Sequence, residues 1–314
     1  MRYLCLLLVC GLLPARSAAG GEVFAEFLSW KATEPVDWVL NTNRNPADQY
    51  VTYETLSYDF APGLRIGGRT GDEWETTFTY THFQTSTSAA AAGDLTGAFL
   101  GGKLSQPPQP KLYFDTGQID AGIRYNMFDL DLGKRYRPAD ALMMRPIVGL
   151  RSGWIHQSFT SRLQAQYSDN NLPVHKSIVE EMENNFWGVG PKVGIENSLN
   201  LWRSEACEVN GLLNFSAAYL WGQWQISDVT GSSTVTNGVD SRSTQVIGVP
   251  DRDFGALAFQ AVLGLNVKYR DWSATVGYEI NDWLNQCQIF DDATGPHNNE
   301  LILQGLTLNV GYDF

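Results

Sequence analysis

The sequence predicts an all-β fold: a transmembrane antiparallel up-and-down β-barrel of about ten strands, with long outer loops and short periplasmic turns. Three observations support this prediction: an N-terminal export signal, apolar and polar residues that alternate along many short segments, and connections that are alternately long and short. The 314 residues are 43% hydrophobic, 12% aromatic and 18% charged. That composition excludes a collagen, a coiled coil and a largely disordered chain.

Residues 1–19 have the layout of a secretory signal peptide. Arg2 precedes an apolar run over residues 4–13, and Ser17-Ala18-Ala19 supplies the small residues that a signal peptidase reads. We therefore expect cleavage after about Ala19, export to the bacterial outer membrane, and a single domain over residues 20–314. Beyond the signal, no run approaches the roughly 18 to 20 apolar residues that a spanning helix needs, which leaves a soluble exported protein or a β-barrel.

Residues 302–314 show the alternation most clearly. Leu306, Leu308 and Val310 are apolar at every second position, whereas the intervening residues are small or polar. One apolar and one polar face at a period of two indicate a strand between two unlike media. The sequence stops on an aromatic residue, Phe314, similar to the terminal signal of bacterial outer-membrane proteins, so we expect the barrel assembly machinery as a partner.

The same alternation recurs along the rest of the chain and predicts further strands. They are expected at residues 23–30, 50–69 with a bend at Pro62-Gly63, 73–85, 119–137, 142–158, 185–199, 209–224, 255–270 and 272–280. The long connections are 32–49, 86–118, 159–183, 225–254 and 286–299, and the short ones lie near residues 70, 139, 203 and 271. This alternation is typical of outer-membrane barrels, and an even strand number places both termini on the periplasmic side. Barrels of about eight or twelve strands remain alternatives, because residues 50–69 and 111–118 can be divided differently.

The segment 119–137 contains a change of phase. Its apolar residues occupy odd positions up to Met127 and even positions from Phe128 onwards. A β-bulge near these two residues would shift the alternation in this way. With the next strand paired from residue 142, Asp129 is expected opposite Arg151, as an ion pair inside the lumen.

Charged side chains lie on the predicted inward face of several strands. The expected lumen-lining charges are Asp120, Arg124, Asp129, Asp131, Arg145, Arg151, Lys192, Glu196 and Glu279. A barrel of this size leaves little space inside, because about eight strands fill with side chains and about sixteen leave a channel. We therefore expect a plugged or very narrow lumen.

Aromatic residues are expected to form two belts at the membrane surfaces, in contact with outer-membrane lipids. Toward the long-loop ends they are Trp30, Trp154, Trp187, Trp221, Trp224 and Trp283. Near the short turns they are Trp74, Trp202 and Trp272, joined by Tyr312 and Phe314 of the last strand.

Five stretches of strand and turn residues point to a known family. They are residues 60–68 (FAPGLRIGG) with 74–83, residues 128–134 (FDLDLGK), 145–151 (RPIVGLR), 183–191 (ENNFWGVGP) and 219–222 (YLWG). Together they resemble the Legionella major outer-membrane protein type of pore-forming barrel, which also occurs in planctomycete-like bacteria. The resemblance spans about residues 50–270. It implies an outer-membrane location and a pore-type role, and it supplies no active-site residues.

The expected function is a passive, porin-like channel of narrow bore for small ions or solutes. A non-conducting surface-structural or adhesin-like barrel is the alternative. A minor alternative is a lipid acyl hydrolase, because His156 and Ser158 lie two apart on one strand face and a histidine can activate a serine hydroxyl. The surrounding sequence does not match such enzymes, and His156 fits better beside Trp154 in the aromatic belt. We therefore expect no enzymatic activity.

No cofactor and no metal are expected. The histidines outside that pair are isolated from one another: His82, His175 and His297. The loop acids Asp291-Asp292 fit a solvated role. Cys207 and Cys287 are expected at opposite rims as free thiols, since a disulfide needs Cα atoms within about 7 Å. Removal of residues 1–19 takes two arginines and no acid from a net charge of −12, which leaves −14. That charge argues against a nucleic-acid partner.

Overall fold

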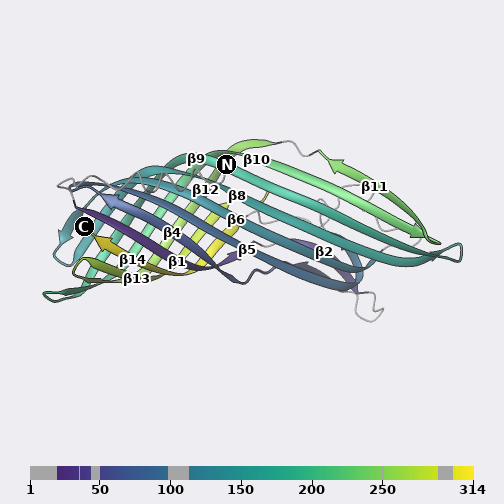
Figure 1. Cartoon of the computed structure of the whole chain (residues 1–314), viewed down its shortest axis with the longest axis horizontal. Helices are drawn as coiled ribbons and strands as arrows, with labels where there is room; N and C mark the ends of the chain where they lie inside the picture. Colours follow the sequence, from purple (N-terminus) through teal and green to yellow (C-terminus); the bar gives the residue numbers. More distant parts are fainter. Residues whose placement is uncertain (1–19, 35, 44–49, 98–112, 249–250, 289–299) are drawn as a thin grey trace.

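Ten strands close into one antiparallel barrel, which confirms the predicted fold (Figure 1). The computed structural model describes residues 20–34, 36–43, 50–97, 113–248, 251–288 and 300–314. Around the ring the strands are β1 (Gly21–Thr33), β4 (Phe60–Thr70), β5 (Trp74–Gly97), β6 (Phe114–Lys134), β8 (Leu142–Asp169), β9 (Leu172–Arg203), β10 (Cys207–Thr236), β12 (Arg252–Tyr269), β13 (Trp272–Leu284) and β14 (Leu301–Asp313). The predicted signal peptide, Asp291-Asp292 and His297 lie outside the described residues.

The last strand closes the ring on the first. β14 pairs with β1 along its length, and Gly21 and Phe314 exchange backbone hydrogen bonds of 3.0 and 2.8 Å. This closure lies at the same end as the short turns between β4 and β5 and between β12 and β13. Short turns of outer-membrane barrels are periplasmic, so we refer to this end as the periplasmic end.

Four strands lie outside the ring. β2 (Asp37–Asn43) and β3 (Tyr50–Thr55) form a hairpin that pairs with the far end of β5. β7 (Tyr136–Ala139) pairs with β8, and β11 (Val239–Ile247) pairs with β10. The single strand predicted over residues 50–69 is therefore wrong. β3 and β4 are separate elements, because the intervening Leu56 and Tyr58 turn into the core.

The connections on the outer side are long, as predicted, but much of their length is strand. β8, β9 and β10 contain 28, 32 and 30 residues and continue well past β1, β13 and β14 (Figure 1). Residues 159–183, expected as a loop, are the outer parts of β8 and β9. They are joined by a tight turn at Asn170-Asn171, where both φ angles are positive, 48° and 65°. Asparagine tolerates this left-handed backbone.

The membrane-spanning part places apolar side chains on the outside of the barrel. Val148, Leu213 and Leu308, for example, are each more than half exposed. The aromatic residues predicted for the two belts lie mostly on this outward face: Trp74, Trp154, Trp187, Trp202, Trp221, Trp272, Tyr312 and Phe314. Trp30, Trp224 and Trp283 are instead fully buried at inward positions, so their assignment to a belt is wrong.

The β-bulge predicted at Met127-Phe128 is also wrong. β6 pairs in unbroken register through this point, with Met127 opposite Thr81 and Phe128 opposite Tyr80. Even-numbered side chains of β6 point outward on both sides of the phase change, and odd-numbered ones point inward. The apolar residues change face because the surroundings change: the inward face is charged in the membrane-spanning part and apolar in the outer part.

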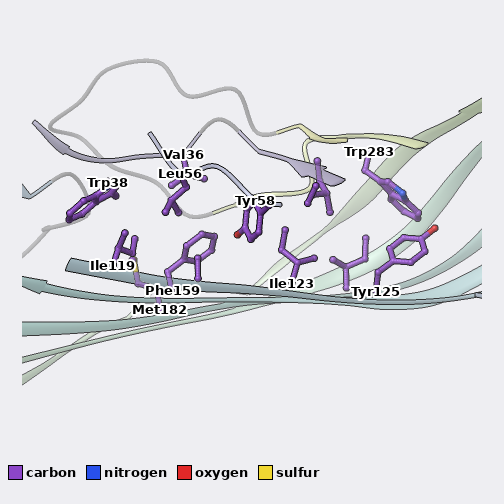
Figure 2. Close-up of a cluster of buried hydrophobic side chains, with 14 of the residues drawn as sticks. Val36, Trp38, Leu56, Tyr58, Ile119, Ile123, Tyr125, Phe159, Met182 and Trp283 are labelled. Carbon is purple, nitrogen blue, oxygen red and sulfur yellow. The ribbon is translucent and has the colours of Figure 1, made fainter. Parts of the chain in front are cut away.

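A hydrophobic core fills the outer part of the barrel. Figure 2 shows side chains from the β2–β3 hairpin and its flanks facing side chains of the long sheet: Val36, Trp38, Leu56 and Tyr58 opposite Ile119, Ile123, Phe159 and Met182. All of these residues are buried. Within the described part of the chain, no helix combines the length and apolar character needed to cross a membrane.

Candidate functional site

Inward charges of the membrane-spanning part form two groups of linked ion pairs, here together called the charged tier. Its members are Glu22, Glu26, Arg65, Arg69, Glu75, Asp129, Asp131, Arg145, Arg151, Lys192, Glu196 and Glu279. Each has an oppositely charged group within 3.8 Å. Seven of the nine predicted lumen charges lie here, so the alternation located most of the charged tier.

The predicted pair of Asp129 and Arg151 is one centre of the charged tier. The two residues are direct partners in the β6–β8 register, and the Arg151 guanidinium donates to both carboxylate oxygens at 2.7 and 2.9 Å. Lys192 on β9 lies 3.4 Å from Asp129 and 2.8 Å from Asp131. Two acids and two bases from three neighbouring strands thus neutralise one another.

Arg65 is a second centre, and it links strands on both sides of the barrel seam. Its guanidinium donates to Glu26 at 3.0 Å and to both oxygens of Glu279 at 2.8 and 2.9 Å. The Gln260 amide accepts from Arg151 at 2.8 Å and donates to Glu279 at 2.7 Å. Gln260 therefore joins the two centres across the lumen.

Arg145 is the third centre and is 1% exposed. It lies 2.9 Å from Glu75 and 2.9 Å from Glu196, and Glu196 also contacts Arg69 at 3.2 Å. Ion pairs buried in this way are costly to break from one side, because the partner is left as an uncompensated charge. The alternation of signs also means that the charged tier presents no surface of one charge.

Asp120 and Arg124 do not belong to the lumen, contrary to the prediction. Both lie on the outward face of β6 in its outer part, where Asp120 pairs with Arg162 at 2.6 Å and Arg124 is exposed. The prediction placed them inside because it assumed a bulge. The same alternation, applied from Leu64 along β4, would have assigned Arg65 and Arg69 to the lumen, and these two were missed.

Above the charged tier, six aromatic side chains cross the lumen and form what we call the aromatic tier: Trp30, Phe83, Tyr125, Phe186, Trp224 and Trp283. Tyr125 on β6 and Trp283 on β13 meet edge to face with ring centroids 5.9 Å apart. These strands are five apart in a ring of ten, so the two rings meet across the full width of the barrel. The Arg65 guanidinium lies 5.5 Å from the Trp30 ring and connects the two tiers.

The segment after β13 folds inward and caps the aromatic tier. The backbone carbonyl of Gln286 accepts hydrogen bonds from the Trp224 indole at 3.1 Å and from the Asn184 amide at 3.0 Å. Gln157 bridges Asn184 to Glu34, a buried acid just beyond the outer end of β1. Burial raises the pKa of the Glu34 carboxyl to about 7, against the lowering effect of its hydrogen bonds. Polar groups therefore hold this segment over the rings.

The lumen is open on the periplasmic side of the charged tier. A vestibule of about 480 Å³ reaches from the turn residues Arg203 and Lys268 up to Asp129 and Glu279. Asparagine, serine and threonine make up about a third of its lining residues, and charged residues are somewhat more numerous. Cys207 and Cys287 form no disulfide, as predicted, with Cys207 at the periplasmic end and Cys287 buried in the outer part.

His156 and Ser158 share the outward face of β8. The imidazole Nδ1 of His156 contacts the Asn185 side-chain oxygen, and the Asn185 amide donates to Glu183 at 3.2 Å. Hydrolysis of a lipid by this pair is only a minor alternative and stays untested; unchanged hydrolysis in Ser158→Ala would remove it. Within the described part of the chain, no three potential metal ligands of the His, Cys, Asp or Glu type cluster together.

Comparison with solved structures returns other outer-membrane barrels. The outer membrane protease OmpT of Escherichia coli is 12% identical, with 95% of this chain and 99% of that chain covered and a TM-score of 0.41. A major outer membrane protein of Thermus thermophilus is 11% identical, with coverage of 95% and 100% and a TM-score of 0.32. Among curated proteins none matches the chain.

The sequence itself carries a family assignment over almost its whole length. The model described as Legionella pneumophila major outer membrane protein precursor matches residues 16–314, which extends the resemblance expected over residues 50–270 to the chain's last strand. The protein therefore belongs to the Legionella major outer membrane protein family.

Proposed function

We propose that the protein is a non-conducting, surface-structural barrel of the outer membrane. The observation that carries the proposal is the contact between Tyr125 and Trp283 across the full width of the barrel. Both rings are buried, and the capping segment is held to the same tier by the hydrogen bond from the Trp224 indole to the Gln286 carbonyl. An ion moving along this axis would have to leave water and pass through packed aromatic rings, which costs many times the thermal energy.

The charged tier supports the same proposal. A conducting pore needs charges that hold passing ions weakly, whereas here each charge is already matched by a neighbouring side chain. Arg65, Arg151 and Gln260 join strands from different sides of the wall. We infer that this network braces the barrel against deformation.

A narrow porin-like channel is the second candidate. The vestibule favours it, because a cavity of about 480 Å³ already reaches from the periplasmic end up to the charged tier. Conduction by this route would require the capping segment and Trp283 to move aside. The two candidates therefore differ in whether the aromatic tier opens.

Planar-bilayer recordings of the refolded protein test the proposal. We expect no stepwise current from the unchanged protein across the physiological range of voltage. The double variant Tyr125→Ala, Trp283→Ala should conduct if the rings are the barrier, and the matched variant Trp221→Ala, on the lipid-facing side, should stay silent. Steady ion-selective steps from the unchanged protein would contradict the proposal in favour of the porin-like channel.

Two further partners follow from this role. The outward apolar band and its tryptophans fit contact with outer-membrane lipids.

The Phe314 ring packs over Gly21 at the seam, where a Cβ atom on residue 21 would lie 2.7 Å from the ring. We propose that the strand ending at Phe314 engages the barrel assembly machinery before the seam closes. Loss of outer-membrane insertion after removal of Phe314 would support this, and normal insertion would contradict it.

A further inference from the structure

A belt of neutral polar side chains runs around the vestibule wall. Asn309, Thr275, Asn266, Asn210 and Asn200 are successive cross-strand partners on β14, β13, β12, β10 and β9. All five line the vestibule. Here they are called the amide belt. Register alone aligns them, so five neighbouring strands each present one neutral hydrogen-bonding group at the same level of the cavity.

The amide belt has unused hydrogen-bonding capacity. Asn200 donates to Asn210 at 3.0 Å, and Asn266 donates to Thr275 at 2.9 Å. These bonds keep the side chains in defined orientations. A carboxamide has two donor hydrogens and an oxygen with two lone pairs, so each asparagine of the belt retains groups for another partner. Donors and acceptors therefore stand side by side without a net charge.

An aromatic ring faces the same cavity, one inward-facing position nearer the periplasmic end than the amide belt. Phe24 points inward from β1 into the vestibule and is only partly buried, although the walls around it are polar. Its cross-strand partners are glycines, Gly67 on one side and Gly311 on the other. A Cβ atom on residue 67 would lie 2.4 Å from the ring, so the glycine gives the ring the space to lie against the wall.

We propose that the vestibule binds a short, uncharged oligosaccharide that enters from the periplasmic end. Sugar hydroxyls both donate and accept, which matches the amide belt, and the apolar C–H face of a pyranose ring packs on an aromatic face such as that of Phe24. The vestibule volume of about 480 Å³ lies within the range of small-molecule sites. The site does not depend on whether the lumen conducts, because the charged tier closes it from above.

Charged ligands fit the vestibule less well. Most of the bases that line it have an acidic partner, for example Arg203 with Glu208 at 2.9 Å and Arg69 with Glu196 at 3.2 Å. A charged ligand inside the cavity would have to compete with these ion pairs. An uncharged ligand can use the amide belt without disturbing any ion pair.

Calorimetry and saturation-transfer NMR on the full chain test the proposal. The protein is kept in a detergent whose headgroup is not a sugar, and the probes are maltotetraose and tetra-N-acetylchitotetraose. We expect millimolar or tighter binding of at least one probe. A Phe24→Leu variant, which keeps an apolar side chain but loses the ring face, should bind about five- to tenfold more weakly. Asn210→Ala should weaken binding by about fivefold.

Matched variants on the outside of the barrel keep the test specific. Phe78→Leu on the lipid-facing side and Asn185→Ala on the outer surface should bind as the unchanged protein does. Heat-modified mobility on gels shows that each variant has folded. No binding of either probe at about 10 mM, or equal binding by Phe24→Leu and Phe78→Leu, would overturn the proposal.

Discussion

The membrane-spanning part and the outer part of the barrel are built from the same strands with opposite patterns. In the spanning part of β6, Leu130 is half exposed to lipid while Asp129 and Asp131 are buried in the charged tier. Further along the same strand, Tyr125 is buried in the aromatic tier while Arg124 is exposed on the outside. Even-numbered side chains of β6 point outward in both parts. What changes is the medium around the barrel, which is lipid in the spanning part and water in the outer part.

This difference explains why one sheet can serve two surroundings. A strand directs its side chains alternately to two faces, and each face takes the polarity of the medium that it meets. Lipid outside requires an apolar outer face, so the interior is left for charges that must pair. Water outside permits a polar outer face, so the interior becomes an ordinary hydrophobic core. The two tiers should therefore respond differently to substitution.

The largest effect is expected in the aromatic tier. Trp283→Ala removes a fully buried ring and leaves a cavity between opposite walls, which should lower the free energy of unfolding by about 4 kcal/mol. Urea unfolding of the refolded protein measures this. The lipid-facing control Trp221→Ala should change stability far less, and an equal loss in both variants would contradict the proposed packing.

A slightly smaller effect is expected in the charged tier. Arg145→Met leaves Glu75 and Glu196 without their buried partner, although Arg135 and Arg69 still contact them. We expect a loss of about 3 kcal/mol in the free energy of unfolding. The control Arg124→Met removes an exposed arginine from the outer face and should leave the urea midpoint nearly unchanged.

Glu34, which Gln157 and Asn184 link to the capping segment, should give the barrel a pH dependence. The pKa of Glu34 is raised from 4.5 to about 7 in the folded state by burial, so ionisation opposes folding. Stability is then greatest below pH 4.5, falls as the pH rises toward about 7, and is constant above that. Glu34→Gln should remove this slope and stabilise the protein by about 3 kcal/mol at pH 8. Unfolding midpoints from pH 4 to 8 measure the effect, and an unchanged slope in the variant would contradict the assignment.

The smallest effect is expected on the outer face. Asp120 and Arg162 pair at 2.6 Å, but both are nearly half exposed to water. Arg162→Gln should cost less than about 1 kcal/mol, and salt should reduce the difference further. If Arg162→Gln lowered the free energy of unfolding as much as Arg145→Met, the outer face around this pair would not be exposed to water, contrary to the structure.

The sequence predicts the spanning part far better than the outer part. Strand positions, the lipid-facing residues and the Asp129–Arg151 pair all follow from alternation, because lipid imposes the same rule on every strand. Alternation also continues into the outer part, but there it shows only that one face of each strand is apolar and the other polar. It does not show which of the two faces points inward. Which face is inside depends on the partner across the barrel, and that information is not local. For this reason Asp120 and Arg124 were assigned to the lumen and Trp283 to a belt.

Some features had no signal in a single sequence. The contact of Tyr125 with Trp283 joins residues 158 positions apart, and their meeting depends on ring closure. Gln286 caps the rings through its backbone carbonyl, which any residue possesses. The amide belt was open to prediction, since Asn309, Thr275 and Asn266 occupy inward positions, but their common level follows only from the register.

Cysteine accessibility along β6 tests the reversal of pattern most directly. Single cysteines replace Ile123 and Arg124 in a Cys207→Ser, Cys287→Ser background, and a membrane-impermeant maleimide is added to intact cells. Arg124→Cys should be labelled rapidly and Ile123→Cys should remain protected, because the first points to water and the second to the core. Labelling of Ile123→Cys with protection of Arg124→Cys would contradict the account, since it would mean that a bulge does exchange the two faces of the strand.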